Sequence, residues 1–379
     1  MDDGRGRKQA LYAVKFVQRG ELVDEAIKKE VINHCMLMHE NIARFREVIL
    51  CPRHLAIVME FAQGGDLFAA VQQSKGHKMN EPMARYFFQQ LIAGLGYMHC
   101  QVLPRRLPWT TSPERSGSPT HASASSVQGM CHRDLKLENL LLTDNPPKLK
   151  ICDFGYSKSM KWQSQAKSKV GTAAYIAPEV ITAARGSQYN SEAVDVWSSG
   201  VVLHTMLAGM YPFCDVSMPN DETRTIRRIL EFMKGVVGYA PPAGVSEGGV
   251  DLLRRMLVAD PSQRININDI INHKWFQANL PRGCTTAACP PDPSFPQQAV
   301  EQMQAILQQA VVLGSAMGAP ATIAEHTPTY ESQGALDRQT SEGSILSHGL
   351  SHNLEDGETF TPAASLTLAD SGVDSMLET

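Results

Sequence analysis

One short run of sequence decides the fold: Cys131-His132-Arg133-Asp134-Leu135-Lys136-Leu137-Glu138-Asn139. Two shorter runs follow it along the chain, Asp153-Phe154-Gly155 and then Ala177-Pro178-Glu179. Together they supply carboxylate and amide oxygens, the ligands that Mg²⁺ prefers, and a lysine close to a carboxylate. This set suits phosphoryl transfer, because the negative charge that spreads over the moving group must be met by metal ions and positive charge.

The three runs resemble the catalytic loop, the metal-binding turn and the activation-segment end of eukaryotic protein kinases. A lone His-Arg-Asp is weak evidence, but all three runs in this order and at these separations are specific. The resemblance implies that Asp134 accepts or orients the substrate hydroxyl proton and that Lys136 lies near the transferred phosphate. It also implies that Asn139 and Asp153 hold Mg²⁺, so ATP and Mg²⁺ are the expected cofactors.

Composition narrows the class of protein. The chain has 379 residues, of which 43% are hydrophobic and 20% charged, as in a soluble globular protein. A net charge of −4 gives no reason to expect a nucleic-acid partner, and no apolar run approaches the length of a membrane span. The eight cysteines lack metal-ligand spacing, so reduced intracellular thiols are expected.

The N-terminal part is predicted to form the small lobe of a kinase. The β-branched run 11–17 predicts a strand carrying Lys15, the lysine expected to pair with the α- and β-phosphates of ATP. Helical spacing of apolar residues predicts a helix over 22–38, on which Glu30 is the expected ion-pair partner of Lys15. A solvated strand lysine is the alternative for Lys15. Two further strands are predicted over 46–50 and 55–60.

The resemblance also implies an adenine pocket. Glu60-Phe61-Ala62 would be the hinge whose backbone groups hydrogen-bond adenine, and Ala13 and Leu141 would sandwich the ring. Asp66 is expected near the ribose and an incoming basic side chain. Because Asp66 and Glu138 are both acidic, we expect protein substrates of the Arg-x-x-Ser type, with a basic residue before the phosphorylated serine.

Residues 156–176 are expected to form an activation segment controlled by phosphorylation. Arg133 would meet a phosphate on this segment and order it. Ser168 is the first candidate for that phosphate and Ser164 the second. Two structural contacts are also expected. Glu179 should form a buried ion pair with Arg264, and Asp195 should hydrogen-bond the backbone of the catalytic loop.

The expected fold class is α+β, a bilobal kinase fold with a small β-rich lobe and a larger helical lobe. The predicted domains are a small lobe over 1–62, a large lobe over 63–283, a linker and docking helix over 284–319, and a disordered acidic tail over 320–379. Residues 101–130 interrupt the large lobe. Their Ser-, Pro- and Arg-rich sequence indicates a disordered insertion or a retained non-coding segment, in preference to a regulatory loop.

Four runs resemble a particular kinase family, the plant sucrose-non-fermenting-related kinases of the second subfamily: residues 13–20, 55–60, 131–139 and 150–159. That resemblance implies a serine/threonine kinase activated by osmotic stress and, in part, by abscisic acid, from a plant or green alga. It further implies Ser168 as the activating serine, a post-kinase helix near 300–307 that docks on the Glu30 helix, and type-two-C protein phosphatases as partners of the acidic tail. A monomer in cytoplasm and nucleus is expected.

Two features depart from the family pattern. Lys169 and Ala173 replace the expected Thr and Pro. More seriously, only fourteen residues precede Lys15, and Gly4-Arg5-Gly6-Arg7-Lys8-Gln9 is not a glycine-rich phosphate-covering loop. The small lobe is therefore expected to lack its first two strands. This leaves a second hypothesis, a catalytically impaired kinase-like module that binds phosphatases or substrates.

Overall fold

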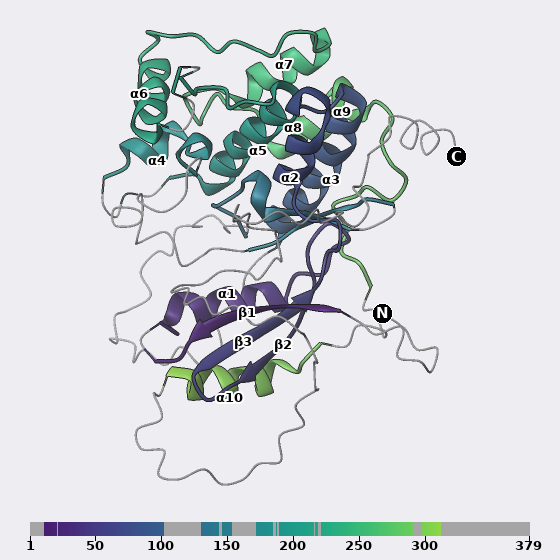
Figure 1. Ribbon diagram of the computed structural model, residues 1–379, viewed down its shortest axis with the longest axis vertical. Helices are drawn as coiled ribbons and strands as arrows, with labels where there is room; N and C mark the ends of the chain where they lie inside the picture. Colours follow the sequence, from purple (N-terminus) through teal and green to yellow (C-terminus); the bar gives the residue numbers. More distant parts are fainter. Residues whose placement is uncertain are drawn as a thin grey trace, which may run out of the picture. The chain divides into compact units, whose positions relative to one another are not determined.

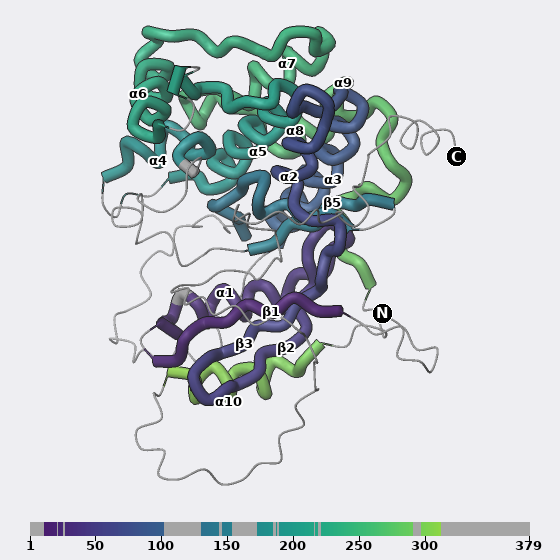
Figure 2. The backbone as a smooth tube through the Cα atoms, viewed as in Figure 1, coloured from purple at the N-terminus to yellow at the C-terminus, as the bar shows by residue number. Residues whose placement is uncertain are grey.

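The computed structural model describes residues 11–20, 22–101, 130–143, 146–153, 172–184, 187, 189–215, 217–218, 221–290 and 297–311. The described chain divides into two compact units, each treated by itself here. Unit 1 holds the described residues up to Met36, Arg44–Phe61 and 297–311, and unit 2 holds Leu37–Ala43 and the described residues from Ala62 to 290 (Figures 1 and 2). The predictions for Ser164, Ser168, the tail 320–379 and nearly all of 101–130 lie outside the described residues.

Unit 1 is built on an antiparallel sheet of three described strands, in the order β1-β3-β2. The strands are β1 (Tyr12–Gln18), β2 (Phe45–Leu50) and β3 (His54–Glu60). The central strand β3 is buried over all five residues from Leu55 to Met59. Lys15 lies opposite Ile57, so the register of β1 fixes the face of the sheet to which Lys15 belongs.

Two helices pack with this sheet. Helix α1 (Glu25–Cys35) begins at Asp24, whose carboxylate accepts the Ile27 N–H at 2.9 Å, a normal N-cap. Helix α10 (Val300–Val311) contacts β2, β3 and α1, and Figure 1 shows it beside β2. Its buried face consists of Met303, Leu307 and Ala310, spaced as one stripe of a helix.

The outer edge of β2 is covered by Gln298, just before α10. The Gln298 side chain accepts the Val48 N–H at 3.0 Å and donates to the Val48 carbonyl at 3.3 Å, as a paired strand would. The Gln298 backbone N–H also donates to the Arg46 carbonyl at 2.8 Å. An edge strand with unpaired groups invites aggregation, so this amide both terminates the sheet and fixes the start of α10.

Unit 2 is mainly helical. Its core is α5 (Ser191–Ala208), buried almost throughout, which packs against α3 (Glu81–Cys100). Trp197 is completely buried and stacks on Phe213. The remaining described helical elements are α2 (Leu67–Gln73), η1 (Lys75–His77), η2 (Leu137–Asn139), η4 (Thr172–Tyr175), α4 (Pro178–Thr182), α6 (Glu222–Met233), α7 (Glu247–Met256), α8 (Ile267–Ile271) and α9 (Lys274–Gln277).

One short hairpin crosses unit 2. Strand β4 (Leu140–Leu142) pairs antiparallel with β5 (Leu149–Ile151), so that Leu140 lies opposite Ile151. All three residues of β5 are buried. The hairpin matters for function because the catalytic stretch leads directly into β4, and Asp153 comes directly after β5.

From the sequence, residues 267–275 are predicted to form one helix; this is wrong in one respect, because the structure has two helices, α8 and α9, with a break between them. The break lies at His273, whose backbone is extended and whose Nδ1 accepts the Trp275 N–H at 3.2 Å. A side chain that caps a new helix in this way competes with continuation of the old one.

In the part of the chain that is described, no helix is long and apolar enough to cross a membrane.

Candidate active site

The catalytic stretch brings Asp134, Lys136 and Asn139 together. The Asn139 Nδ2 donates to the backbone carbonyl of Asp134 at 2.7 Å and to its Oδ2 at 3.3 Å. Lys136 Nζ lies 3.5 Å from the same Oδ2. Asp134 and Asn139 are both buried, with 7% and 5% of their surface exposed. A carboxylate held by an amide and an ammonium group in this way has a defined orientation before any substrate arrives.

Asp153 is brought to the same place by the hairpin. The Cys152 N–H donates to the Asn139 carbonyl at 3.0 Å, which extends the β4–β5 pairing by one step. Asn139 and Asp153 therefore lie at neighbouring ends of paired strands, although 13 positions separate Asn139 from Cys152 in the sequence. Asp153 has a positive φ of 58°, a conformation that aspartate tolerates better than most residues.

His132 joins the catalytic stretch to the segment before Asp153. Its Nδ1 accepts the Asp134 N–H at 3.3 Å, which leaves Nε2 as the donor to the Cys152 carbonyl at 3.0 Å. This pair of bonds fixes one tautomer of a fully buried ring. The His132 imidazole thus helps to connect the loop that carries Asp134 with the strand end that carries Asp153.

Asp195, at the start of α5, supports the stretch from the other side. Its carboxylate accepts the N–H groups of His132 and Arg133, both at 2.8 Å, and the His99 Nε2 at 2.9 Å. Burial alone would raise the pKa of Asp195, but the bond from His99 and the backbone donors outweigh it, and the pKa is lowered. The expected contact between Asp195 and the backbone of the catalytic stretch is present.

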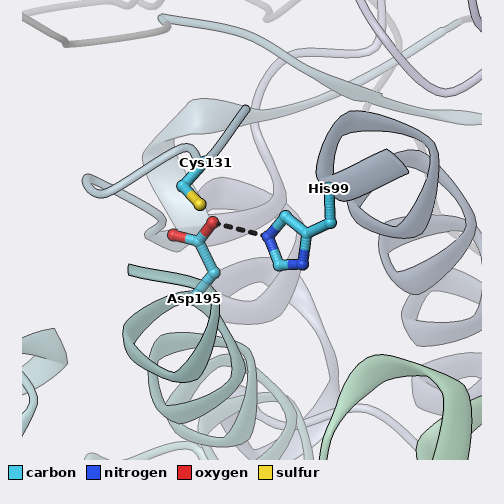
Figure 3. A group of neighbouring side chains, drawn as sticks. All are labelled: His99, Cys131 and Asp195. Carbon is cyan, nitrogen blue, oxygen red and sulfur yellow. Dashed lines mark hydrogen bonds and ion pairs between the residues drawn. The ribbon is translucent and has the colours of Figure 1, made fainter. Parts of the chain in front are cut away.

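Figure 3 shows that Cys131 lies beside the bonded pair of His99 and Asp195. The three residues offer ligand atoms within 4.8 Å of one another. The residues do not fit a metal site. Both oxygens of Asp195 are already used by N–H donors. Burial raises the pKa of the Cys131 thiol strongly, whereas a metal binds the thiolate. We interpret the cluster as a structural support of the catalytic stretch.

Glu138 gives the site an acidic side. Burial, reinforced by the carboxylates of Asp66 and Asp134, raises the pKa of Glu138, because these surroundings disfavour its charged form. Its Oε2 is buried and has no hydrogen-bond partner in the structure as described. Nearby, the Tyr175 hydroxyl accepts the Leu137 N–H at 3.4 Å, and its ring meets that of Tyr211 edge to face. The rings of Tyr175 and Tyr211 therefore line the site on the side of Glu138.

Arg133 is held in an unusual way. Its φ is 64°, in the left-handed region, and its backbone N–H is fixed by Asp195. The Nε atom is buried without a hydrogen-bond partner among the described residues. A buried guanidinium N–H that lacks an acceptor is costly, which marks it as a place for an anion.

The expected ion pair between Glu179 and Arg264 is present. The two guanidinium nitrogens of Arg264 lie 2.7 and 2.9 Å from the two carboxylate oxygens of Glu179. The Arg264 side chain is completely buried, and it also donates to the carbonyls of Ala193 and Val258. This pair fastens the start of α4 to the chain that precedes α8.

The structure places four of the predicted site residues in unit 1. Lys15 Nζ lies 3.2 Å from Glu30 Oε1, so the expected ion pair is present, with both side chains at least 85% covered. Ala13 lies opposite Met59 in the sheet. Glu60 ends β3 and accepts the Arg44 N–H through its Oε2 at 3.1 Å.

In unit 2, Asp66 and Leu141 come together, because an isolated β-bridge joins them. Asp66 also caps α2 by accepting the Ala69 N–H at 2.7 Å. The backbone just before this bridge passes so close to Thr143 that position 64 has to be glycine. A Cβ on Gly64 would lie 2.5 Å from the Thr143 carbonyl oxygen. Ala62, two positions earlier, is buried at 8% exposure.

Sequence reasoning missed the roles of His99, Cys131, Tyr175 and Tyr211 in this site. Each is supplied by a segment distant in sequence from its partner, and no local pattern distinguishes such a residue from ordinary core. The position of Tyr175 just before Ala177-Pro178-Glu179 was the one available signal.

The comparisons with known proteins agree with this geometry. The protein kinase domain family matches residues 4–104 and 126–276. The chain belongs to the protein kinase family. It is 44% identical to serine/threonine-protein kinase SRK2A of Physcomitrium patens, over 82% of this chain and 80% of the relative. It is also 44% identical to SAPK3 of Oryza sativa subsp. indica, over 84% and 87% of the two chains, and to SRK2E of Arabidopsis thaliana, over 80% and 75%.

Within that family the chain is a sucrose-non-fermenting-related kinase of the second subfamily, as expected. It is a serine/threonine protein kinase of stress signalling, an ATP-binding transferase that acts on protein substrates. The expected α+β fold class and plant origin are likewise supported. The alternative hypothesis of a catalytically impaired binding module is not favoured. Protein kinases generally use ATP and Mg²⁺.

Proposed function

We propose that Asp134 receives the proton of the substrate hydroxyl while the γ-phosphate of ATP is transferred to that oxygen. The observation that carries this proposal is the bonding of one Asp134 carboxylate to both Asn139 and Lys136. Asn139 orients the carboxylate, and Lys136 can move from Asp134 Oδ2 to the phosphate as charge develops there. Asp134 contributes to transfer and not to nucleotide binding.

Asn139 and Asp153 would hold Mg²⁺. The donor set fits this ion, because the Asn139 Nδ2 is used by Asp134 and the amide oxygen is left as the ligand atom, beside an Asp153 carboxylate. When bound, Mg²⁺ neutralises charge on the triphosphate oxygens. The neighbouring strand ends of Asn139 and Asp153 set the spacing of the two ligands without help from the metal.

For the nucleotide, we propose that Lys15 meets the α- and β-phosphates and that Glu30 keeps its ammonium group extended. The backbone of Glu60 and Ala62 would hydrogen-bond adenine, Ala13 and Leu141 would cover the ring, and Asp66 would lie by the ribose. The 3.2 Å ion pair of Lys15 and Glu30 and the bridge of Asp66 to Leu141 support these roles.

For the protein substrate, we propose a basic residue three positions before the phosphorylated serine or threonine. Glu138 supports this, because its buried Oε2 lacks a hydrogen-bond donor in the described part of the chain and Asp66 adds negative charge nearby. An arginine side chain would satisfy the carboxylate with a charge-assisted hydrogen bond.

A peptide comparison tests the substrate proposal. Peptides that differ only in Arg or Ala three positions before serine should differ roughly tenfold or more in kcat/KM, the worth of one charged hydrogen bond. Glu138→Gln should remove most of that difference. Glu247→Gln, an exposed glutamate of α7, is the matched control and should keep it. Equal rates for the two peptides with the parent chain would refute the preference.

For regulation, we propose that a phosphate on Ser168, or on Ser164, accepts a hydrogen bond from the Nε of Arg133. The buried, unsatisfied Arg133 Nε supports an anion at this place. Ser168→Ala should lower activity and Ser164→Ala should not; the reverse result would assign the phosphate to Ser164. We further propose that the acidic tail binds type-two-C phosphatases and that the kinase is a monomer of cytoplasm and nucleus.

A further inference from the structure

Strand β5, labelled in Figure 2, leads into Asp153 and is held on both of its edges. Strand β4 pairs along one edge, and a short segment, residues 41–43, pairs along the other. The Ile151 N–H donates to the Asn41 carbonyl at 2.8 Å, and the Ala43 N–H donates to the Ile151 carbonyl at 2.9 Å. Residues 41–43 thus fix Ile151, two positions before the proposed metal ligand.

The Asn41 side chain extends this hold to the start of β5. Its Nδ2 donates to the Leu149 carbonyl at 3.0 Å and to Gln90 Oε1 at 3.1 Å. Gln90 Oε1 in turn accepts the Leu149 N–H at 2.9 Å. Asn41 and Gln90 are both buried, so these bonds face little competition from water. Asn41 is therefore bonded to the first and to the last residue of β5.

His39 connects Asn41 to a segment that lies far away in the sequence. The His39 Nδ1 accepts the Asn41 N–H at 3.0 Å, so Nε2 carries the proton and donates to the Thr285 carbonyl at 2.7 Å. Burial lowers the pKa of His39, which keeps the ring neutral and Nδ1 an acceptor. The ring also stacks on Tyr97, with centroids 5.1 Å apart. One buried imidazole is thus bonded to Asn41 and to Thr285.

The segment that contains Thr285 is attached at a second point. The Cys289 N–H donates to the Met38 carbonyl at 2.8 Å, while the Tyr97 hydroxyl accepts the Met38 N–H at 2.9 Å. Residues 284–289 open the predicted linker, yet they are bonded to two consecutive residues just before Asn41. We call residues 284–289 the strap.

We propose that the strap is a positioning element for Asp153: it acts through His39 and Asn41 on β5, and so on the carboxylate that would hold Mg²⁺. This rests on the metal-ligand role of Asp153 proposed above. All residues of this path belong to unit 2, and each step is a hydrogen bond of 3.0 Å or less. Because Mg²⁺ demands nearly ideal ligand geometry, a small shift of β5 should weaken its binding.

Two substitutions each remove one attachment of the strap. His39→Asn keeps an oxygen as many bonds from Cα as Nδ1, so it can still accept the Asn41 N–H, but it is too short to reach the Thr285 carbonyl. Cys289→Pro removes the N–H that donates to the Met38 carbonyl. Because Cys289 is only half-buried, Cys289→Pro decides the test should His39→Asn not fold.

Two further variants are controls. Cys289→Ala is matched to Cys289→Pro, because it changes the side chain but keeps the backbone N–H. Asn266→Ala controls for stability alone. It removes the N-cap of α8, where the Asn266 side chain accepts the Asp269 N–H at 3.0 Å, and this cap is outside the path described above.

The test has two measurements on the full chain: the Mg²⁺ concentration that gives half-maximal ATP binding, and the hydrogen exchange of the backbone amides of 149–153. We expect His39→Asn and Cys289→Pro each to raise that Mg²⁺ concentration roughly threefold to tenfold, as loss of one hydrogen bond does, and to speed exchange at Ile151. The KM for an added peptide should stay parental. Cys289→Ala and Asn266→Ala should change neither measurement, although Asn266→Ala should lower the midpoint of thermal unfolding.

A parental Mg²⁺ requirement, or parental exchange at Ile151, in either strap variant would overturn the proposal. So would an equal shift in Asn266→Ala, because the effect would then follow stability and not the strap. Asp153→Asn separates this failure from failure of the metal-ligand role. If Asp153→Asn weakens Mg²⁺-dependent ATP binding while the strap variants do not, only the strap assignment fails. If Asp153→Asn binds Mg²⁺ and ATP as the parent does, the ligand role fails and the proposal with it.

Discussion

The carboxylate of Asp195 accepts the backbone N–H of Arg133 at 2.8 Å, and through this bond helix α5 fixes the backbone beside the proposed catalytic base. The His132 N–H and His99 Nε2 complete its set of donors. Asp195 is completely buried, so these bonds have no competition from water.

We predict that Asp195→Asn is destabilising, because an amide NH₂ would face at least one N–H that now has an acceptor. The expected loss in the free energy of unfolding is about 1–3 kcal/mol, with a fall in kcat from displacement of Asp134. Urea denaturation and peptide phosphorylation measure the two effects. Glu192→Gln, on the exposed side of the same helix, should change neither. A variant at Asp195 with parental stability and kcat would remove the support role.

The Lys15–Glu30 ion pair gives a prediction about nucleotide use. Glu30→Gln keeps the size of the side chain but removes the charge that faces Lys15, so Lys15 should be less well positioned. We expect kcat/KM for ATP to fall about tenfold or more. Glu25→Gln, on the same helix but 82% exposed and paired with Lys28, should leave it within twofold, as for a weak surface pair. Equal effects of the two substitutions would contradict the assignment.

Arg264 tests the buried pair of unit 2. Arg264→Lys keeps the charge but cannot reproduce the two parallel bonds to Glu179 together with those to the Ala193 and Val258 carbonyls. A loss of about 3–5 kcal/mol is expected, as for breaking a buried ion pair. Arg255→Lys, in the exposed pair with Asp251, should cost less than about 1 kcal/mol. Thermal denaturation measures the stability of the two variants. Equal stability of Arg264→Lys and Arg255→Lys would contradict this account.

His204 predicts a pH dependence of stability. Burial lowers the pKa of His204 from 6.5 to about 4, and its Nδ1 is bonded to the Tyr239 hydroxyl at 2.8 Å. A depressed folded-state pKa means that the unfolded chain takes up a proton first as the pH falls. The contribution of His204 is therefore complete above about pH 6.5 and is lost between that pH and about 4, a total of about 3 kcal/mol.

We expect His204→Phe to flatten the part of the stability profile between pH 6.5 and 5, since the substituted ring cannot be protonated. The measurement is the midpoint of thermal unfolding at a series of pH values for parent and variant. His77→Phe, at an exposed histidine, is the control and should keep the parental slope. Parallel profiles for the parent and His204→Phe would show that this ring is not the group responsible.

Much of this fold could be predicted from the sequence, because its elements have strong local signals. Helix α3 follows from its apolar stripe, and the Asn80 cap and Pro82 lie where helix starts require them. Strands β1 and β3 follow from β-branched runs. The break between α8 and α9 was missed, because the competing signal was a single side-chain cap by His273.

The site was predicted less completely than the fold. Asp134, Asn139 and Asp153 could be predicted as site residues because their motifs are local in sequence. The bond from His99 to Asp195, the contact of Tyr175 with Tyr211, and the closure of β2 by Gln298 were not predicted, because each depends on partners far away in the chain. Contacts of this kind are set by packing, and a single sequence carries no periodic trace of them.

The central claim is that Asp134, Asn139 and Asp153 form one site with divided roles. It is tested most directly by measuring Mg²⁺-dependent ATP binding and phosphoryl transfer for Asp134→Asn and Asp153→Asn side by side. Both variants should lose transfer by about a hundredfold or more, while only Asp153→Asn should weaken Mg²⁺-dependent binding of ATP. If Asp134→Asn kept its transfer rate, or if Asp153→Asn bound Mg²⁺ and ATP as tightly as the parent, the claim would be contradicted.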